Sequence, residues 1–167
     1  MNYLRDEISN NPDTEIVKRC NYIIIRLNNS FNNRRKYLIS LDEIKSIEHM
    51  KPMMIPIYFF SGTSTSVPYE SYSTLGDLKY SLMNKLKLKV GRIPYFSMYE
   101  ILDKADSTEE RILEEEEKVV NMRSMWEFDT ERFNKTNTKV EFRIYLKMIL
   151  YYGYTEEDVD SVTLSFY

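Results

Sequence analysis

The sequence predicts an α+β fold in which one helix covers one face of a mixed β-sheet. Two strand-like segments, residues 53–60 and 67–70, flank the small polar turn SGTSTS. A helix-like segment follows at 71–88, and a third strand-like segment, YFSMYEI, occupies 95–101. A β-hairpin followed by a helix and another strand is the opening of a ubiquitin-like β-grasp unit. We expect a helical segment before this lobe and a strand and helix extension after it.

The segment 53–60 is the first strand of the predicted hairpin. Both its odd-numbered and its even-numbered positions are largely apolar, which predicts a strand in the interior of the sheet. Pro56 opposes that placement, because a proline cannot donate a hydrogen bond to a neighbouring strand. Gly62 gives the turn a residue that can adopt positive φ.

The helix at 71–88 has a clear start and one apolar face. Thr74 and Asp77 form an acidic variant of the capping box, and leucines recur at helical spacing. This apolar stripe must pack on one face of the sheet. The helical spacing of the leucines and the alternation of side chains along the strands therefore predict together which residues form the core. That core consists of Ile55, Ile57, Phe59, Val67, Leu75, Leu78, Leu82, Leu86, Phe96, Met98 and Ile101.

The sequence before the lobe divides into a polar arm and a helical segment. Residues 1–10 have no helical periodicity, which predicts an arm, whereas Pro12 marks a helix start at residues 11–12. Ser40 and Glu43 form a second capping box, and the short helix that follows would use Leu41, Ile44 and Ile47 as its apolar face. The apolar face of the first helix consists of Ile16, Cys20, Ile23, Ile24 and Leu27.

The sequence after the third strand is less regular. Val119 and Val120, with Ile112 and Leu113, are candidates for the short last strands, and Trp126 is expected to close the core. A weakly patterned stretch, 129–138, then separates the lobe from a half-buried strand at 140–149. Tyrosines 151, 152 and 154 and a short capped helix follow.

Composition argues for a protein without a membrane span or a disulfide. The 167 residues are 43% hydrophobic, enough to bury a core, yet no run of about 18 apolar residues occurs. The N-terminal residues lack the apolar stretch of a signal peptide, which predicts a cytoplasmic protein. Cys20 is the single cysteine, so no internal disulfide can form, and the net charge of −3 disfavours a nucleic-acid binder.

Catalytic and cofactor sites are not predicted. His49 has no second ligand type at metal spacing, which favours a surface or helix-end role. No glycine-rich phosphate loop occurs among four glycines, and no nucleophile has a supporting base nearby. The acidic run Glu114 to Glu117 is typical of a solvated turn or short exposed helix, and its alternative is a docking site for a basic partner. We therefore expect a non-catalytic module with neither a metal nor a cofactor.

Several segments resemble one family. The stretch KPMMIPIYFFSGTSTSVPYESYSTLGDLKYSLMNKLKL, with YFSMYEI and ERILEEEEKVVNMRSMWE, resembles the first lobe of a FERM domain of the kind joined to a MyTH4 domain in unconventional myosin and some kinesin tails. RRKYLISLDEIKSI is similar to the end of MyTH4, although Leu38 and Ile39 stand where that family has prolines. KVEFRIYLKMIL and TEEDVDSVTLSFY resemble the connector and the start of the second FERM lobe.

The resemblance implies domain boundaries and a function. It implies an arm at 1–10, the end of MyTH4 at 11–50, the first FERM lobe at 51–128 and the connector with the start of the second lobe at 129–167. The implied function is a protein-interaction and scaffolding module of a motor tail, in the cytoplasm and associated with the cytoskeleton. One alternative is a structural subunit of a large complex that uses the lobe for packing. A regulatory fragment of a FERM-containing kinase or phosphatase is disfavoured by the MyTH4-like segment.

Two surfaces are candidates for partner binding. The first is a positive patch suited to an acidic protein segment or, weakly, to acidic lipid headgroups, with a solvated helix face as its alternative. It consists of Lys79, Lys85, Lys87, Lys89 and Arg92. The second is apolar and lies at the two ends, where larger protein assemblies would cover it. It consists of Ile16, Ile23, Ile24, Leu27, Tyr151, Tyr152 and Tyr154.

Overall fold

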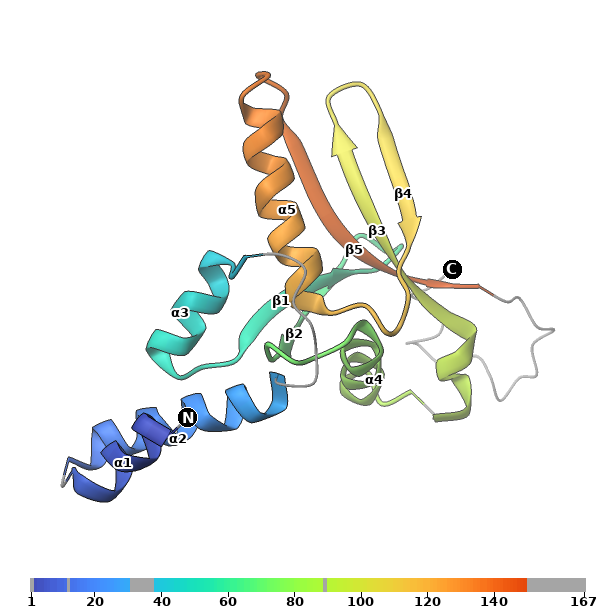
Figure 1. Ribbon diagram of the computed structural model, residues 1–167. Coiled ribbons are helices and arrows are strands. Elements are labelled where there is room, and N and C mark those ends of the chain that lie inside the picture. Colours follow the sequence, from blue (N-terminus) through green and yellow to red (C-terminus); the bar gives the residue numbers. More distant parts are fainter. Residues whose placement is uncertain (1, 12, 31–37, 89, 150–167) are drawn as a thin grey trace.

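A computed structural model describes residues 2–11, 13–30, 38–88 and 90–149. Its centre is a five-stranded mixed sheet in the order β2-β1-β5-β3-β4 (Figure 1). The strands are β1 (Met53–Tyr58), β2 (Ser64–Tyr69), β3 (Phe96–Lys104), β4 (Thr108–Ile112) and β5 (Val140–Met148). The helices are α1 (Asn2–Asn10), α2 (Thr14–Ser30), α3 (Leu41–His49), α4 (Leu75–Lys85), the 3-10 helix η1 (Val90–Tyr95) and α5 (Val119–Asn134). The α+β fold is confirmed.

The first hairpin explains how a proline fits inside the sheet. β1 and β2 pair antiparallel from Met53 opposite Tyr69 to Tyr58 opposite Ser64, and the turn contains Gly62 at φ 80°. On its other side, β1 pairs in parallel with β5 only at Ile57 and Tyr58. Pro56 therefore lies before the β5 pairing begins, where its missing N–H costs no hydrogen bond to that strand.

Only one face of β1 is covered. Met53, Ile55 and Ile57 are buried, whereas Met54 on the opposite face is 51% exposed. The core on the covered face includes leucines of α4 and also Val119 and Trp126 of α5, so both helices lie on the same side of the sheet. β1 is an interior strand of the sheet, as predicted. Its second apolar face, which was also expected to be covered, is exposed to solvent at Met54.

The helix α4 forms as the sequence predicts. The Thr74 side chain accepts a hydrogen bond from Asp77 N, and the Asp77 side chain accepts one from Thr74 N, at 3.1 and 2.9 Å. Leu75, Leu78 and Leu82 are at most 2% exposed. Of the eleven predicted core residues, Leu86 is only partly buried, and Ile101 is buried outside the main core. Ile101 alternates with Glu100 on β3 and lies opposite Arg143, on the other face of the sheet.

The end of the lobe differs from the prediction. Val119 and Val120 begin helix α5 and do not form strands. β5 lies at the centre of the sheet, between β1 and β3, in the region that the sequence assigned to a connector outside the lobe. The strand itself was predicted correctly, but alternation does not reveal a strand's neighbours. Trp126 is buried and stacks on Phe142 of β5 at 5.3 Å, as expected for a residue that closes the core.

Residues before the lobe also differ from the prediction. The proposed arm is helix α1, which packs against α2 (Figure 1). α2 begins at Thr14, where the Asp13 side chain accepts a hydrogen bond from Glu15 N at 2.9 Å, and Pro12 lies outside the described residues. Cys20 on α2 is 7% exposed, consistent with a packing role.

The helix α3 is oriented opposite to the prediction. Ser40 caps it by accepting a hydrogen bond from Glu43 N at 3.2 Å. The helix buries Glu43 and Ser46, while Leu41 and Ile44 are 64% and 45% exposed. Polar contacts favour this orientation. The hydroxyl of Tyr22 on α2 lies 3.4 Å from Ser46 O and 3.3 Å from Lys51 O and shares its one proton between them, while the Ser46 hydroxyl donates to Lys51 O. α3 therefore presents apolar side chains at the surface.

The buried Tyr69 should make the stability of the lobe decrease at alkaline pH. Burial raises the pKa of its hydroxyl to about 12, and the nearby Arg123 guanidinium offsets only part of that increase. The unfolded chain loses this proton near pH 10 while the folded chain keeps it, so stability is lost as the pH rises between 10 and 12. We expect the wild type to lose about 1.4 kcal/mol per pH unit in this window relative to Tyr69→Phe. Urea unfolding of both proteins at pH 8 and pH 11 measures this effect. If the free energies of unfolding of the wild type and Tyr69→Phe differ by the same amount at both pH values, the prediction is contradicted.

Candidate interaction surfaces

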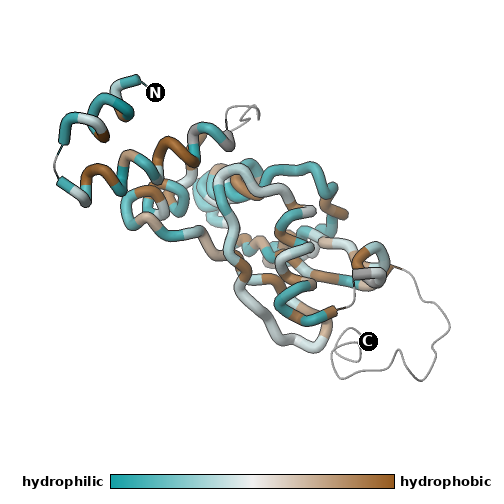
Figure 2. The backbone as a smooth tube through the Cα atoms, turned by 90° about the horizontal axis from the view of Figure 1, so that it is seen from below, coloured by the Kyte–Doolittle hydropathy of each residue, from teal (hydrophilic) through white to brown (hydrophobic). Residues whose placement is uncertain are grey.

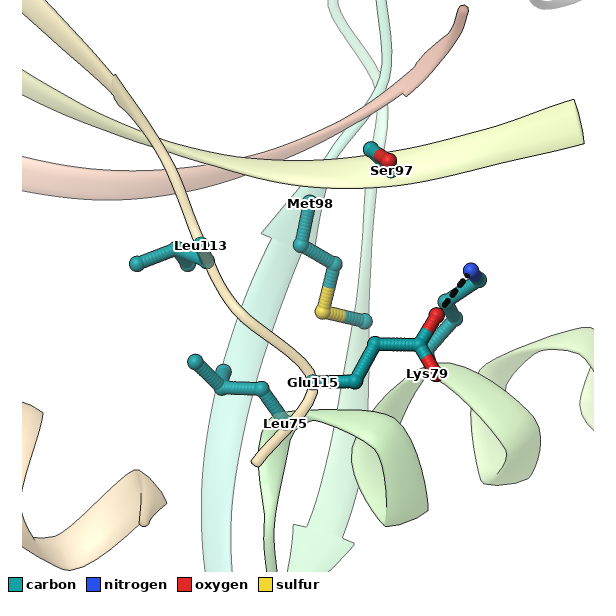
Figure 3. Close-up of a pocket in the computed structure, with 6 residues that line it drawn as sticks. All are labelled: Leu75, Lys79, Ser97, Met98, Leu113 and Glu115. Atoms are coloured by element: carbon teal, nitrogen blue, oxygen red, sulfur yellow. Dashed lines mark hydrogen bonds and ion pairs between the residues drawn. The ribbon is translucent and has the colours of Figure 1, made fainter. Parts of the chain in front are cut away.

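The predicted positive patch does not form as one exposed surface. Lys79 is 5% exposed, and its Nζ pairs with Glu115 Oε1 at 2.6 Å. Figure 3 shows Glu115 reaching from the segment before α5 across the first turns of α4 to meet Lys79. Lys79 is therefore a buried structural cation, because a buried ammonium group needs a charged partner.

The other members of the patch give a smaller positive surface. Lys85 Nζ donates to Ser66 O at 2.8 Å, and Lys87 is exposed at φ 57°. Lys89 and the side chain of Arg92 lie outside the described residues. Binding of an acidic partner by this surface stays a prediction.

The acidic run Glu114 to Glu117 is a structural bridge. Glu115 pairs with Lys79, and Glu117 accepts two hydrogen bonds from Arg111 Nη1 at 2.9 and 3.0 Å. A backbone hydrogen bond also connects the run to α4, since Gly76 N donates to Glu115 O at 2.9 Å. A Cβ at Gly76 would lie 3.3 Å from that oxygen, so the glycine permits this close approach. Glu114, Glu115 and Glu116 are exposed and the run forms a turn, as expected, while Glu115 and Glu117 also pair with basic side chains.

A buried carboxylate links the sheet to α5. Glu100 of β3 is 7% exposed and accepts hydrogen bonds from Trp126 Nε1 and, at 2.8 Å, from Arg111 Nε. Sequence reasoning missed this network, although a glutamate at a core position of an alternating strand was the available signal. Its role is to fix α5 on the sheet.

The residues predicted to form an apolar surface on α2 are exposed to different degrees. Ile16 is 37% exposed, whereas Ile23 and Ile24 are half-buried. Figure 2 shows hydrophobic segments along α2 as well as within the lobe. The side chain of Leu27 and the tyrosines at 151, 152 and 154 lie outside the described residues, so their part in a partner surface stays a prediction.

Charged contacts fasten α2 to the lobe. Arg26 is 6% exposed, pairs with Glu70 after β2, and lies 4.5 Å from the ring centre of Tyr22. Because a guanidinium buried in this way needs its carboxylate partner, α2 is held to the lobe at a defined position.

An open groove of about 340 Å³ lies where α3, α5 and β5 meet. Its apolar lining consists of Leu41, Trp126, Val140 and Phe142. Its polar lining consists of Arg123, Glu127, Thr130, Glu131 and Glu141. Sequence reasoning did not find this groove, because its walls come from three elements whose proximity is set by the fold.

The groove is held in shape by contacts between its walls. Glu127 of α5 accepts a hydrogen bond from Leu41 N at 3.2 Å, which fixes the start of α3. Arg123 pairs with Asp42 of α3, and its guanidinium lies 5.4 Å from the ring centre of Trp126. The groove is thus a preformed feature of these elements.

The described residues provide neither a metal-binding cluster nor a membrane-spanning helix. In the described ranges, no cluster of three or more histidine, cysteine or acidic side chains is arranged to hold a metal ion. His49 lies in the last turn of α3 with its side chain exposed. No helix within the described part of the chain is both long and apolar enough to cross a bilayer.

Residues 51–150 match the protein family described as "RA like domain". The chain therefore belongs to the RA-like domain family. The matched segment contains every strand of the sheet together with α4 and α5, so the RA-like domain extends past β5. A search of curated protein sequences found no match.

The RA-like domain and the helices before it have the fold of a MyTH4-FERM region. The MF1 domain of Dictyostelium discoideum myosin VII matches with a TM-score of 0.70 and 20% identity, over 97% of this chain and 32% of that one. A mutant of the MF2 domain of the same myosin matches with a TM-score of 0.62 and 14% identity, over 92% and 31%. The resemblance that the sequence predicted is confirmed at the level of the fold.

A human structure shows the same fold. The C-terminal MyTH4-FERM domain of human myosin 7b was solved in complex with the harmonin-a PDZ3 domain. It matches the present chain with a TM-score of 0.54 and 16% identity, over 81% of this chain and 26% of the myosin chain. The present chain thus spans about a third or less of the solved structures that it matches.

Proposed function

We propose that this chain is a non-catalytic protein-interaction and scaffolding module of a cytoskeletal motor tail, and that it acts in cargo or cytoskeleton attachment in the cytoplasm. The observation that carries the proposal is the match over 97% of the chain to the myosin VII MF1 domain, since it includes the helices before the lobe as well as the lobe. A related myosin 7b domain is in complex with a PDZ domain, which supports protein partners for this chain.

The experiment is an affinity pull-down from native extract with the purified chain as bait, followed by mass spectrometry. We expect motor, cargo or cytoskeletal proteins to be enriched over a ubiquitin bait, which has a β-grasp fold of its own and controls for nonspecific capture. Enrichment of none of these classes would contradict the proposal.

A second candidate is a structural subunit that uses the lobe for packing in a large complex. The exposed apolar side chains near the start of α3 favour it, since Leu38 is 88% and Leu41 64% exposed. Gel filtration of native extract distinguishes the two, because a structural subunit would elute only with a complex of constant composition.

A further inference from the structure

We propose that the groove between α3, α5 and β5 binds a basic peptide segment of a partner protein, in which lysine or arginine flanks an apolar side chain. The groove is lined by Leu41, Trp126 and Phe142, with glutamates among its polar residues. This proposal rests on the proposed function, because it gives the protein-interaction module a specific binding site.

The lining suits an apolar anchor. A volume of about 340 Å³ is within the range of ligand pockets, and such pockets combine apolar walls with a few polar groups. Leu41 is 64% exposed, so an apolar side chain placed against it would remove apolar surface from water. Phe142 is only partly buried and stacks at 5.3 Å on the buried Trp126, which fixes the position of its ring in the groove wall.

The charges of the lining favour a cation. Three glutamates face one arginine, and that arginine is already paired with Asp42. Glu141 is paired with Arg143 at 2.7 Å. Among the described residues Glu131 forms no ion pair, and Glu127 only accepts a hydrogen bond from Leu41 N, so both carboxylates keep capacity to accept bonds from a partner's lysine or arginine.

The same charges disfavour other partners. An anionic ligand such as a nucleic acid or an acidic membrane would be repelled by the uncompensated glutamates. A second copy of this chain would have to offer basic residues beside an apolar side chain, and sedimentation tests that arrangement directly.

The test uses a phage-displayed library of random 12-residue peptides, selected against the purified chain. We expect selected peptides to carry lysine or arginine next to leucine or an aromatic residue, and to bind more weakly as salt is added. Glu131→Lys should weaken their affinity by about tenfold or more, because it reverses a charge on the groove. Glu116→Lys is the matched control, since Glu116 is exposed and does not line the groove.

A second pair of variants tests the apolar wall. Leu41→Ser should also weaken the selected peptides by about tenfold, whereas Ile44→Ser, on the same helix but outside the groove lining, should not. Both positions are exposed, so neither variant is expected to unfold the chain, and urea unfolding checks this. Peptides that bind all four variants equally, or groove-dependent peptides without basic residues, would overturn the proposal. So would a dimer that Leu41→Ser abolishes, or a selection that yields no binder.

Comparison with the pull-down separates the two proposals. If Glu131→Lys captures the same motor or cargo proteins as the wild type, the groove assignment fails while the proposed function stands. If the peptides require the groove but the wild type captures no such proteins, the proposed function fails while the basic-peptide site stands.

Discussion

Leu82→Ala is expected to lower the free energy of unfolding by about 2–5 kcal/mol. Leu82 lies on α4 with 0% exposure and belongs to the core that α4 and α5 form with the sheet. Removing its side chain leaves a cavity that the tightly packed neighbours cannot fill. The loss of stability is then the sum of the transfer free energy of the removed apolar atoms and the cost of the cavity.

The control for Leu82→Ala is Asn84→Ala on the same helix. Asn84 is exposed, so its replacement should change stability by less than about 0.5 kcal/mol. Urea unfolding followed by circular dichroism measures both variants. A loss at Leu82 no greater than at Asn84 would mean that the leucine stripe of α4 does not face the sheet.

The elements that the sequence predicted well are those whose signals are local. The capping box of α4 lies within four residues, and the leucine stripe lies within one helix, so short-range spacing was sufficient. The first hairpin was found for the same reason, although β2 begins earlier than the apolar pattern indicated, at Ser64 within the polar turn.

The features that sequence reasoning missed depend on distant partners. The alternation in β5 predicted a strand, but its parallel pairing with β1 joins residues more than eighty positions apart. The lysines on α4 and after it predict an exposed Lys79, whereas Lys79 is buried and pairs with the exposed carboxylate of Glu115, thirty-six positions away. Met83, four residues later and 0% exposed, was the local sign that Lys79 faces inward.

The predicted orientation of α3 is wrong because contacts with distant residues also determine which of its sides is buried. Its apolar residues predicted the buried side, yet hydrogen bonds from Tyr22 and the ion pair between Arg123 and Asp42 hold its polar side against the rest of the chain. The exposed apolar side then supplies Leu41 to the groove. A candidate binding feature therefore arises where the local pattern and the tertiary contacts disagree.

Glu100→Ala is expected to lower the free energy of unfolding by about 2–4 kcal/mol. The variant leaves the indole N–H of Trp126 without its acceptor, in a position where that side chain is 5% exposed. It also removes one of the two carboxylate partners of Arg111, but that side chain keeps Glu117, is 45% exposed and can be hydrated. Most of the loss should therefore come from the buried indole.

Two further variants separate these contributions. Glu100→Gln keeps a carbonyl oxygen for the indole and should lose only about 1–2 kcal/mol, because a neutral acceptor forms a weaker hydrogen bond than a carboxylate. Arg111→Gln should cost less than Glu100→Ala, about 1–2 kcal/mol, because the buried Glu100 carboxylate loses its cationic partner but keeps its hydrogen bond from the indole. Trp126 is the only tryptophan, so its fluorescence reports directly on the altered site during urea unfolding. If Arg111→Gln proved as destabilising as Glu100→Ala, the ion pair and not the buried indole would hold α5 on the sheet.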